Sequence, residues 1–171
     1  MENFVLIGYM GSGKTTVGQK LAVLKGFTFV DTDEMIVEQQ KKSINEIFAS
    51  QGEEAFRQME TELLRQLIAD GSENRVIATG GGMPIKEENR PLLSALGTVV
   101  YLKATPTTIY NRVKYDKNRP LLQCENPRAK ICEMIDQRNP IYEAVASMIV
   151  NVGGESHLKV AKEILARYYN T

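Results

Sequence analysis

The sequence has little of what marks several large classes of protein. Lys and Arg number 21 and Asp and Glu also number 21, so the formal net charge is zero. This balance lacks the basic excess of a general nucleic-acid binder, and the absence of tryptophan argues against a stacking platform for single strands. No run approaches the roughly 20 apolar residues of a membrane span. We therefore expect neither a nucleic acid nor a membrane as a partner.

Cysteine is scarce, and no signal peptide is recognisable because the N-terminus lacks a basic segment. Cys124 and Cys132 form neither a CxxC pair nor a zinc pattern. We interpret both as free thiols, which are typical of a reducing cytoplasm. With 171 residues, of which 43% are hydrophobic and 25% charged, the chain fits a single globular domain over 1–171. The neutral composition is compatible with a monomer.

Apolar, β-branched runs alternate with amphipathic segments along the chain. The predicted strands are 4–7, 27–30, 75–78, 98–102 and 147–150. The predicted helices are 15–25, 34–40, one beginning with a capping box at Ser43, 53–70, 91–96, 106–113, 127–145 with an interruption near Pro140, and 156–168. This alternation predicts an α/β fold with a five-stranded parallel sheet covered on both faces. In such folds ligands bind at the carboxyl ends of the strands.

A phosphate-binding motif follows the first predicted strand. Residues 8–15 read GYMGSGKT and match G-x-x-x-x-G-K-[ST] between a strand and a helix. Glycines let the backbone wrap an anion, and successive N–H groups then face the phosphates. Lys14 would contact the β- and γ-phosphate oxygens, and the Thr15 hydroxyl would ligate Mg²⁺. The motif predicts a P-loop that binds a nucleoside triphosphate through Gly11, Ser12, Gly13, Lys14, Thr15 and Thr16.

The rest of the sequence narrows the kind of P-loop protein. No Asn-Lys-x-Asp motif for guanine is present, and the third predicted strand ends in Ala78-Thr79-Gly80 rather than in the aspartate of a usual Walker B strand. A chain of 171 residues leaves little room for a motor or a transporter module. A small-molecule kinase fits best.

Two carboxylates and a run of glycines follow the next strands. Asp31 and Asp33 are two residues apart, and on an extended segment they would project to the same side. One could hold water on Mg²⁺ and the other could accept a hydrogen bond from a substrate hydroxyl. Asp33 or Thr32 as a plain helix cap, and Asp31 as a solvated strand end, are the alternatives. Residues 80–82 are all glycine, which indicates either a close approach by a ligand or a flexible turn.

Several basic residues remain ambiguous from their positions alone. Arg57 and Arg138 could be binding groups or members of surface ion pairs. Arg112 and Arg119 flank a polar segment that could close over phosphates, or they could be solvated charges. His157 is the only histidine, and we interpret it as a surface residue at the start of a helix.

Taken together, the motifs closely resemble the shikimate kinase family. The segments that carry the resemblance are GYMGSGKT (8–15), DTD (31–33), GEEAFRQME (52–60), ATGGG (78–82), RPLL (119–122) and RNPIY (138–142). The resemblance extends over about residues 4–150 and implies a P-loop NTPase fold of the nucleoside-monophosphate-kinase type. It also implies ATP-dependent phosphorylation of the 3-hydroxyl of shikimate, with Mg²⁺, in aromatic amino-acid synthesis through chorismate.

The resemblance assigns roles residue by residue. Asp33 matches the residue that binds the substrate hydroxyls and orients or deprotonates the nucleophile, and Arg57 and Arg138 match the pair that grips the carboxylate. The remaining matches are Gly80 and Gly81 as backbone donors to the substrate, Asp31 as the residue that holds Mg²⁺ through water, Arg119 as the lid arginine on the phosphates, Arg112 as the arginine against the adenine, and Glu60 as the partner that orients Arg57. The catalytic residues are then Lys14, Asp33 and Arg119.

The resemblance further implies substrate-binding helices over about 34–62 and a lid over about 113–125. One departure is that residues 152–155 lack the arginine that some family members place by the adenine, so only the backbone is expected to contact the base there. Two other functions stay open. A kinase for another small polyol acid such as gluconate would share the P-loop and lid, and a silent nucleotide-binding regulator would share the fold.

Overall fold

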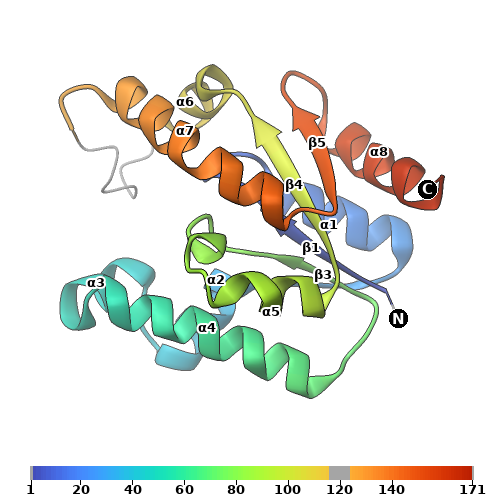
Figure 1. Cartoon of the computed structure of the whole chain (residues 1–171), viewed down its shortest axis with the longest axis horizontal. Helices are drawn as coiled ribbons and strands as arrows, with labels where there is room; N and C mark the ends of the chain where they lie inside the picture. Colours follow the sequence, from blue (N-terminus) through green and yellow to red (C-terminus); the bar gives the residue numbers. More distant parts are fainter. Residues whose placement is uncertain (1, 116–123, 171) are drawn as a thin grey trace.

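The computed structural model describes residues 2–115 and 124–170, and its centre is a parallel sheet (Figure 1). The strands are β1 (Asn3–Ile7), β2 (Thr28–Asp31), β3 (Arg75–Ala78), β4 (Thr98–Ala104) and β5 (Met148–Val152). Their spatial order is β2-β3-β1-β4-β5, and all neighbouring pairs are parallel. The predicted five-stranded parallel sheet is thus confirmed. Because the order reverses beside β1, the crevice at its carboxyl end is the natural ligand site of this fold.

Helices cover both faces of the sheet. They are α1 (Lys14–Lys25), α2 (Thr32–Gln40), α3 (Ile44–Gln51), α4 (Glu53–Asp70), α5 (Asn89–Leu96), α6 (Pro106–Val113), α7 (Pro127–Val145) and α8 (His157–Tyr169), with a 3₁₀ turn, η1, at Met83–Ile85. On one face α1 packs against α8, and on the other α5 and α7 cross the sheet (Figure 1). The helices α2, α3 and α4 contact one another and form a group beside β2. Within the described residues, no helix is long and apolar enough to cross a membrane.

The core explains why these segments become strands. All five residues of β1 and all four of β3 are buried, as expected for central strands covered on both faces. Phe4 pairs in register with Val76 on one side and with Thr98 on the other. Truncating a fully buried side chain such as Ile77 to alanine is expected to cost about 2–5 kcal/mol of unfolding free energy. The sheet therefore holds the ends of its strands in fixed positions.

The structure corrects the predictions around Asp31. The residue closes β2 and is itself the N-cap of α2, since its Oδ1 atom accepts hydrogen bonds from the backbone N–H groups of Asp33 and Glu34. Neither Asp33 nor Thr32 is the cap, and Asp33 lies in the first turn of α2 rather than on an extended segment. A carboxylate at the N-cap satisfies free N–H groups and is favoured by the helix dipole.

Other boundaries also differ from prediction. The helix α7 runs through Pro140 without the predicted interruption, because buried side chains on both sides of the proline hold it against the rest of the protein. The strands β4 and β5 extend further than predicted because they pair with each other as far as Ala104 and Val152. The turn η1 was not predicted. Most of the predicted lid, including Arg119, lies outside the described residues.

Candidate functional site

A hollow opens at the carboxyl ends of the strands, and we call it the strand-end hollow. Its volume is about 460 Å³. It is lined by Met10, Gly11, Gly13, Lys14, Thr15, Thr16, Asp31, Asp33, Thr79, Gly80, Gly81, Arg112, Val113 and His157. Residues from the first three strand ends, which are far apart in the sequence, thus meet in one place. This is the arrangement expected from the alternation of strands and helices.

The predicted P-loop forms the floor of the hollow between β1 and α1. Gly8, Gly11 and Gly13 all have positive φ angles, of 152°, 77° and 100°. A Cβ atom on Gly8 would lie 2.7 Å from the carbonyl oxygen of Leu102, so the tight turn requires glycine there. Lys14 Nζ donates hydrogen bonds to the carbonyl oxygens of Gly8 (2.6 Å) and Tyr9 (3.1 Å). The loop is therefore closed around a cation at the start of a helix, which is an anion-binding geometry.

Two oxygen groups lie together beside the P-loop. Thr15 Oγ1 donates a hydrogen bond of 3.0 Å to Asp31 Oδ2. Hydroxyl and carboxylate oxygens are typical ligands of Mg²⁺, together with water and phosphate oxygens. The described residues contain no cluster of three or more His, Cys, Asp or Glu side chains that could hold a metal by themselves. The Thr15–Asp31 pair fits a magnesium site that a bound nucleotide completes.

A buried carboxyl group stands behind Asp33. The side chain of Glu60 is fully buried, and its Oε1 atom accepts a hydrogen bond of 2.7 Å from Arg57 Nη1. A Cβ atom on Gly80 would lie 2.9 Å from both Asp33 Oδ1 and Glu60 Oε2. Burial raises the pKa of Glu60 to about 7, while Arg57 acts in the opposite direction and Asp33 raises the pKa further.

Arg57 is positioned by several close contacts. A Cβ atom on Gly82 would lie 2.5–2.7 Å from the guanidinium group, so the glycine leaves the space that Arg57 occupies. Its Nη2 atom lies 3.5 Å from the exposed carboxylate of Glu53. The guanidinium also lies 5.4 Å from the centre of the Phe56 ring. Arg57 is thus partly buried on α4, with its charged end beside the glycines that follow β3.

Arg138 approaches the same region from α7. Its guanidinium carbon lies 5.5 Å from the centre of the Tyr9 ring. Tyr142, one helical turn further, donates a hydrogen bond of 2.6 Å to the carbonyl oxygen of Gly81. Burial raises the pKa of Tyr142 to about 12, and the positive charges of Arg138 and then Arg57 oppose this shift. Arg57 and Arg138, the two arginines predicted to bind the substrate carboxylate, and Gly81 therefore all lie around Tyr142. Tyr142 was not singled out from the sequence, although it ends the RNPIY segment.

The opposite end of the hollow is bounded by Arg112 and His157. Arg112 donates hydrogen bonds to the carbonyl oxygens of Gly11 (2.9 Å) and Gly153 (3.1 Å). The His157 ring lies 3.2 Å from the position of a Cβ atom on Gly13. The interpretation of His157 as a plain surface residue is corrected, since the residue is half-buried and lines the hollow. Burial, then Arg112 and Lys20, lower the pKa of His157. Its position at a helix start after β5 was the only sequence signal.

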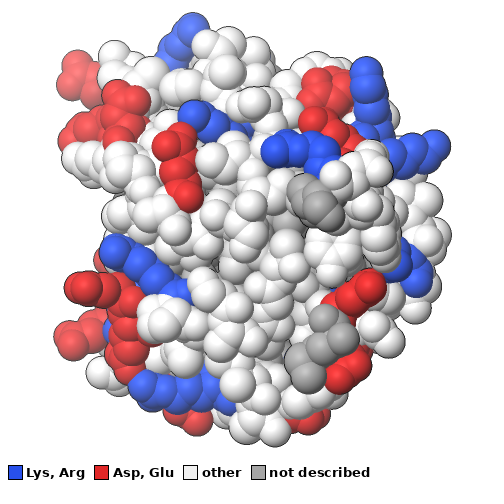
Figure 2. All heavy atoms as spheres, turned by 45° about the vertical axis from the view of Figure 1, so that its right-hand side comes forward, with Lys and Arg blue, Asp and Glu red and all other residues white. Residues whose placement is uncertain are grey.

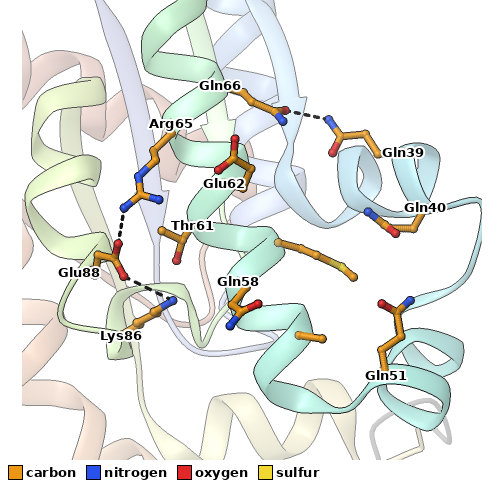
Figure 3. Close-up of a pocket in the computed structure, with 12 residues that line it drawn as sticks. Gln39, Gln40, Gln51, Gln58, Thr61, Glu62, Arg65, Gln66, Lys86 and Glu88 are labelled. Carbon is orange, nitrogen blue, oxygen red and sulfur yellow. Dashed lines mark hydrogen bonds and ion pairs between the residues drawn. The ribbon is translucent and has the colours of Figure 1, made fainter.

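A second hollow lies between α2, α4 and residues 86–88, and we call it the glutamine hollow after Gln39, Gln40, Gln51, Gln58 and Gln66 (Figure 3). Its volume, about 630 Å³, is the larger of the two. Three of its charged side chains form ion pairs, since Glu88 contacts both Arg65 and Lys86. Neutral amides neither titrate nor attack a substrate. Figure 2 shows one face of the molecular surface, where basic and acidic side chains lie next to one another around the edge.

The chain is similar to known proteins in both sequence and structure. A sequence model described as shikimate kinase matches residues 10–169. A shikimate kinase of Nitrosomonas europaea is 44% identical over 96% of this chain and 77% of its own. Another, of Thermodesulfovibrio yellowstonii, is 41% identical over 98% of this chain and 95% of its own. The solved structure of the Acinetobacter baumannii shikimate kinase in complex with shikimate is 38% identical, with a TM-score of 0.94 over 99% of this chain and 94% of that one.

Proposed function

The chain belongs to the shikimate kinase family, and we propose that it transfers the γ-phosphoryl group of ATP to the 3-hydroxyl of shikimate. The products are shikimate 3-phosphate and ADP, in the synthesis of aromatic amino acids through chorismate. The observation that carries this proposal is the meeting of the P-loop, Asp33 and Gly80 in one hollow, with Arg57 behind it. Phosphoryl transfer needs positioning and charge stabilisation more than covalent chemistry, and these groups supply both.

At the nucleotide end, the backbone of the P-loop would hold the phosphates. Gly11, Ser12, Gly13, Thr15 and Thr16 would donate from the loop and from the first turn of α1. Lys14 would leave its backbone carbonyl partners and contact the β- and γ-phosphate oxygens. In our proposal Arg112 bounds the base and Arg119, from the lid, contacts the phosphates. Lys14 and Arg119 would neutralise negative charge that develops on the phosphate oxygens in the transition state.

Magnesium would be held by Thr15 directly and by Asp31 through water. The 3.0 Å contact between Thr15 Oγ1 and Asp31 Oδ2 supports this assignment, because both oxygens already lie at one point beside the P-loop. The ion, when bound, supplies positive charge to the β- and γ-phosphates. The second oxygen of Asp31 stays engaged in capping α2, which fixes the orientation of the carboxylate.

At the acid end, Arg57 and Arg138 would bind the carboxylate of shikimate. Planar guanidinium groups suit a planar carboxylate, and two of them hold it in one orientation. The backbone N–H groups of Gly80 and Gly81 would donate to the substrate. Asp33 would then accept a hydrogen bond from the 3-hydroxyl and either orient it or take its proton as it attacks in line.

We also propose how the chain is organised around this reaction. Residues 1–171 would act as one kinase domain, with substrate-binding helices over about 34–62 and a lid over about 113–125. We expect a monomer, with which the neutral composition is compatible. Free thiols at Cys124 and Cys132 are in keeping with a cytoplasmic enzyme.

The first experiment is the release of ADP in the presence of Mg²⁺ and ATP, with and without shikimate. Quinate and gluconate at equal concentration serve as matched acids. We expect release that depends on shikimate and recovery of phosphorylated shikimate. Release that depends on gluconate would establish the rival polyol-acid kinase, and ATP hydrolysis without any phosphorylated acceptor would favour a nucleotide-binding regulator.

A further inference from the structure

Glu60 is a buried acid whose two oxygens have different surroundings. Oε1 accepts the hydrogen bond from Arg57 Nη1 at 2.7 Å. Oε2 is buried and has no hydrogen-bond partner among the described residues. It points toward Gly80, where a Cβ atom would lie 2.9 Å from it and equally far from Asp33 Oδ1. One oxygen is therefore engaged with a cation while the other lies near a second carboxylate.

The charged groups that face Glu60 are few. Arg57 comes from the same helix, Asp33 from α2, and Lys86 from the segment after η1. Lys86 also pairs with the exposed Glu88, with its Nζ atom 3.6 Å from Oε2 of that residue. Arg57 is thus the main counter-charge of Glu60, and the exposed Glu53 already shares it at 3.5 Å. The ionised form of Glu60 is therefore stabilised mainly by Arg57, which also pairs with Glu53.

Binding of an acid substrate changes this balance. The carboxylate of shikimate would bring another negative charge to Arg57 and exclude water from the space beside Gly80. Both changes disfavour the ionised form of a buried carboxyl group. Glu60 can respond because its pKa is already about 7 before the substrate arrives, as a result of burial.

We propose that Glu60 takes up one proton from solvent on Oε2 when the substrate carboxylate binds to Arg57. The O–H bond forms at Glu60 and a buffer acid loses the proton, so the added negative charge of the substrate is balanced. Oε1 keeps its hydrogen bond to Arg57, so Glu60 continues to position the guanidinium. Glu60 is then a positioning residue whose protonation compensates the charge of the substrate. This inference rests on the proposed function, which places the carboxylate at Arg57.

The sign of the pH dependence follows from this. Below pH 7 Glu60 is already mostly protonated in the free protein, so little proton uptake accompanies binding. Above pH 7, Glu60 is more fully protonated in the shikimate complex than in the free protein, so the affinity for shikimate falls as pH rises. The fall is at most about tenfold per pH unit and ends at the higher pKa of the complex. A free carboxylate with an ordinary pKa near 4.3 would give no such slope above neutrality.

The test is isothermal titration of the full chain with shikimate at pH 8, in buffers of different ionisation enthalpy. The dependence of the heat on the buffer gives the number of protons taken up. We expect about half a proton or more per shikimate bound. Glu60→Gln should bind shikimate with no proton uptake and with a pH-independent affinity, since the amide resembles the protonated acid. Glu53→Gln, which changes the other acid on Arg57, should retain the uptake.

The outcomes separate this inference from the proposed function. Shikimate binding without proton uptake in the unaltered protein, or uptake that persists in Glu60→Gln, overturns the inference alone. No shikimate binding to the folded protein overturns both. If Glu60→Gln does not fold, carboxyl-carbon NMR of the unaltered protein decides. One glutamate that titrates near neutrality should move its midpoint upward with shikimate, and an unmoved midpoint overturns the inference.

Discussion

The phosphate-binding part of the nucleotide end is one continuous segment, residues 8–16, which contributes largely its backbone, and Arg112 and His157 lie at its edge. The acid end is assembled from side chains of α2, α4 and α7 around the glycines that follow β3. Backbone N–H groups survive almost any substitution, whereas a guanidinium or a carboxylate can be deleted. Substitutions at the acid end should therefore separate substrate recognition from catalysis more cleanly than those at the nucleotide end.

The two ends also differ in the groups that hold their cationic side chains, Lys14 and Arg57. Lys14 at the nucleotide end is held by neutral carbonyl oxygens, so a phosphate can replace them without leaving a buried charge behind. Arg57 at the acid end is held by Glu60, which is buried and keeps its own charge or proton after the substrate binds. In our proposal, substrate binding at the acid end is therefore coupled to protonation of a buried carboxyl group.

The largest expected effect comes from Lys14→Ala. This change removes the one side-chain cation that the P-loop directs at the phosphates, and we expect kcat to fall by about 100- to 1000-fold. Steady-state kinetics with saturating ATP and shikimate measure it. Lys20→Ala, an exposed lysine on the same helix, is the control and should stay near the unaltered rate. A variant at Lys14 that keeps near-normal turnover would contradict the P-loop assignment.

The fold was largely predictable because its signals are local. The bounds of β3 and α4 match the prediction, since an apolar run and an amphipathic stripe are bounded by glycine or polar residues. The continuity of α7 through Pro140 was not predictable, because it depends on packing on both sides of the proline rather than on its missing N–H group. The extension of β5 to Val152 likewise depends on pairing with β4.

The two ends of the site also differ in how far the sequence predicted them. The P-loop is contiguous in sequence, so its motif predicted it directly. His157 and Tyr142 were missed because their roles arise from tertiary contacts, with Gly13 and Gly81 respectively. The burial of Glu60 was invisible too, since a glutamate on a helix is ordinarily solvated. Its pairing with Arg57 was expected only from the family resemblance, and the 2.7 Å contact is in keeping with that role.

The next largest effect is expected from Arg57→Ala. Removing the guanidinium should lower kcat/KM for shikimate by about 100-fold, since a buried charged hydrogen-bond partner is lost. The KM for ATP should change little, because the residue belongs to the acid end. Kinetics with each substrate varied in turn measure this. Arg65→Ala, on the same helix but paired with Glu88 in the glutamine hollow, is the control. Equal losses for both substrates would contradict the separation of the two ends.

A smaller and more selective effect is expected from Gly82→Ala. The backbone at Gly82 has an ordinary φ of −86°, so alanine introduces no backbone strain. Its Cβ atom would lie 2.5–2.7 Å from the guanidinium of Arg57, which must move. We expect the KM for shikimate to rise by about tenfold with little loss of thermal stability. Gly154→Ala, where an added Cβ meets nothing within 4 Å, should change neither quantity. An unchanged KM in Gly82→Ala would mean that the position of Arg57 is not critical.

The smallest expected effect is that of His157→Ala at the nucleotide end. The lowered pKa of His157 keeps its imidazole neutral at pH 7.5, so the substitution removes contact area but no charge, and the KM for ATP should rise only about twofold. As pH falls, the phosphates of bound ATP favour the imidazolium, so the unaltered protein gains affinity that the variant lacks. The ratio of the two KM values should therefore grow as the pH is lowered into the acidic range.

Lys159→Ala, an exposed residue in the first turn of the same helix, is the control for this variant and should show no pH-dependent difference. The KM for shikimate should be unchanged in both variants. A larger effect of His157→Ala on shikimate than on ATP would contradict its placement beside Gly13, and with it the division of the hollow into two ends. A ratio of ATP KM values that stays constant with pH would instead mean that the imidazole lies too far from the phosphates to interact with their charge, so that His157 acts by contact alone.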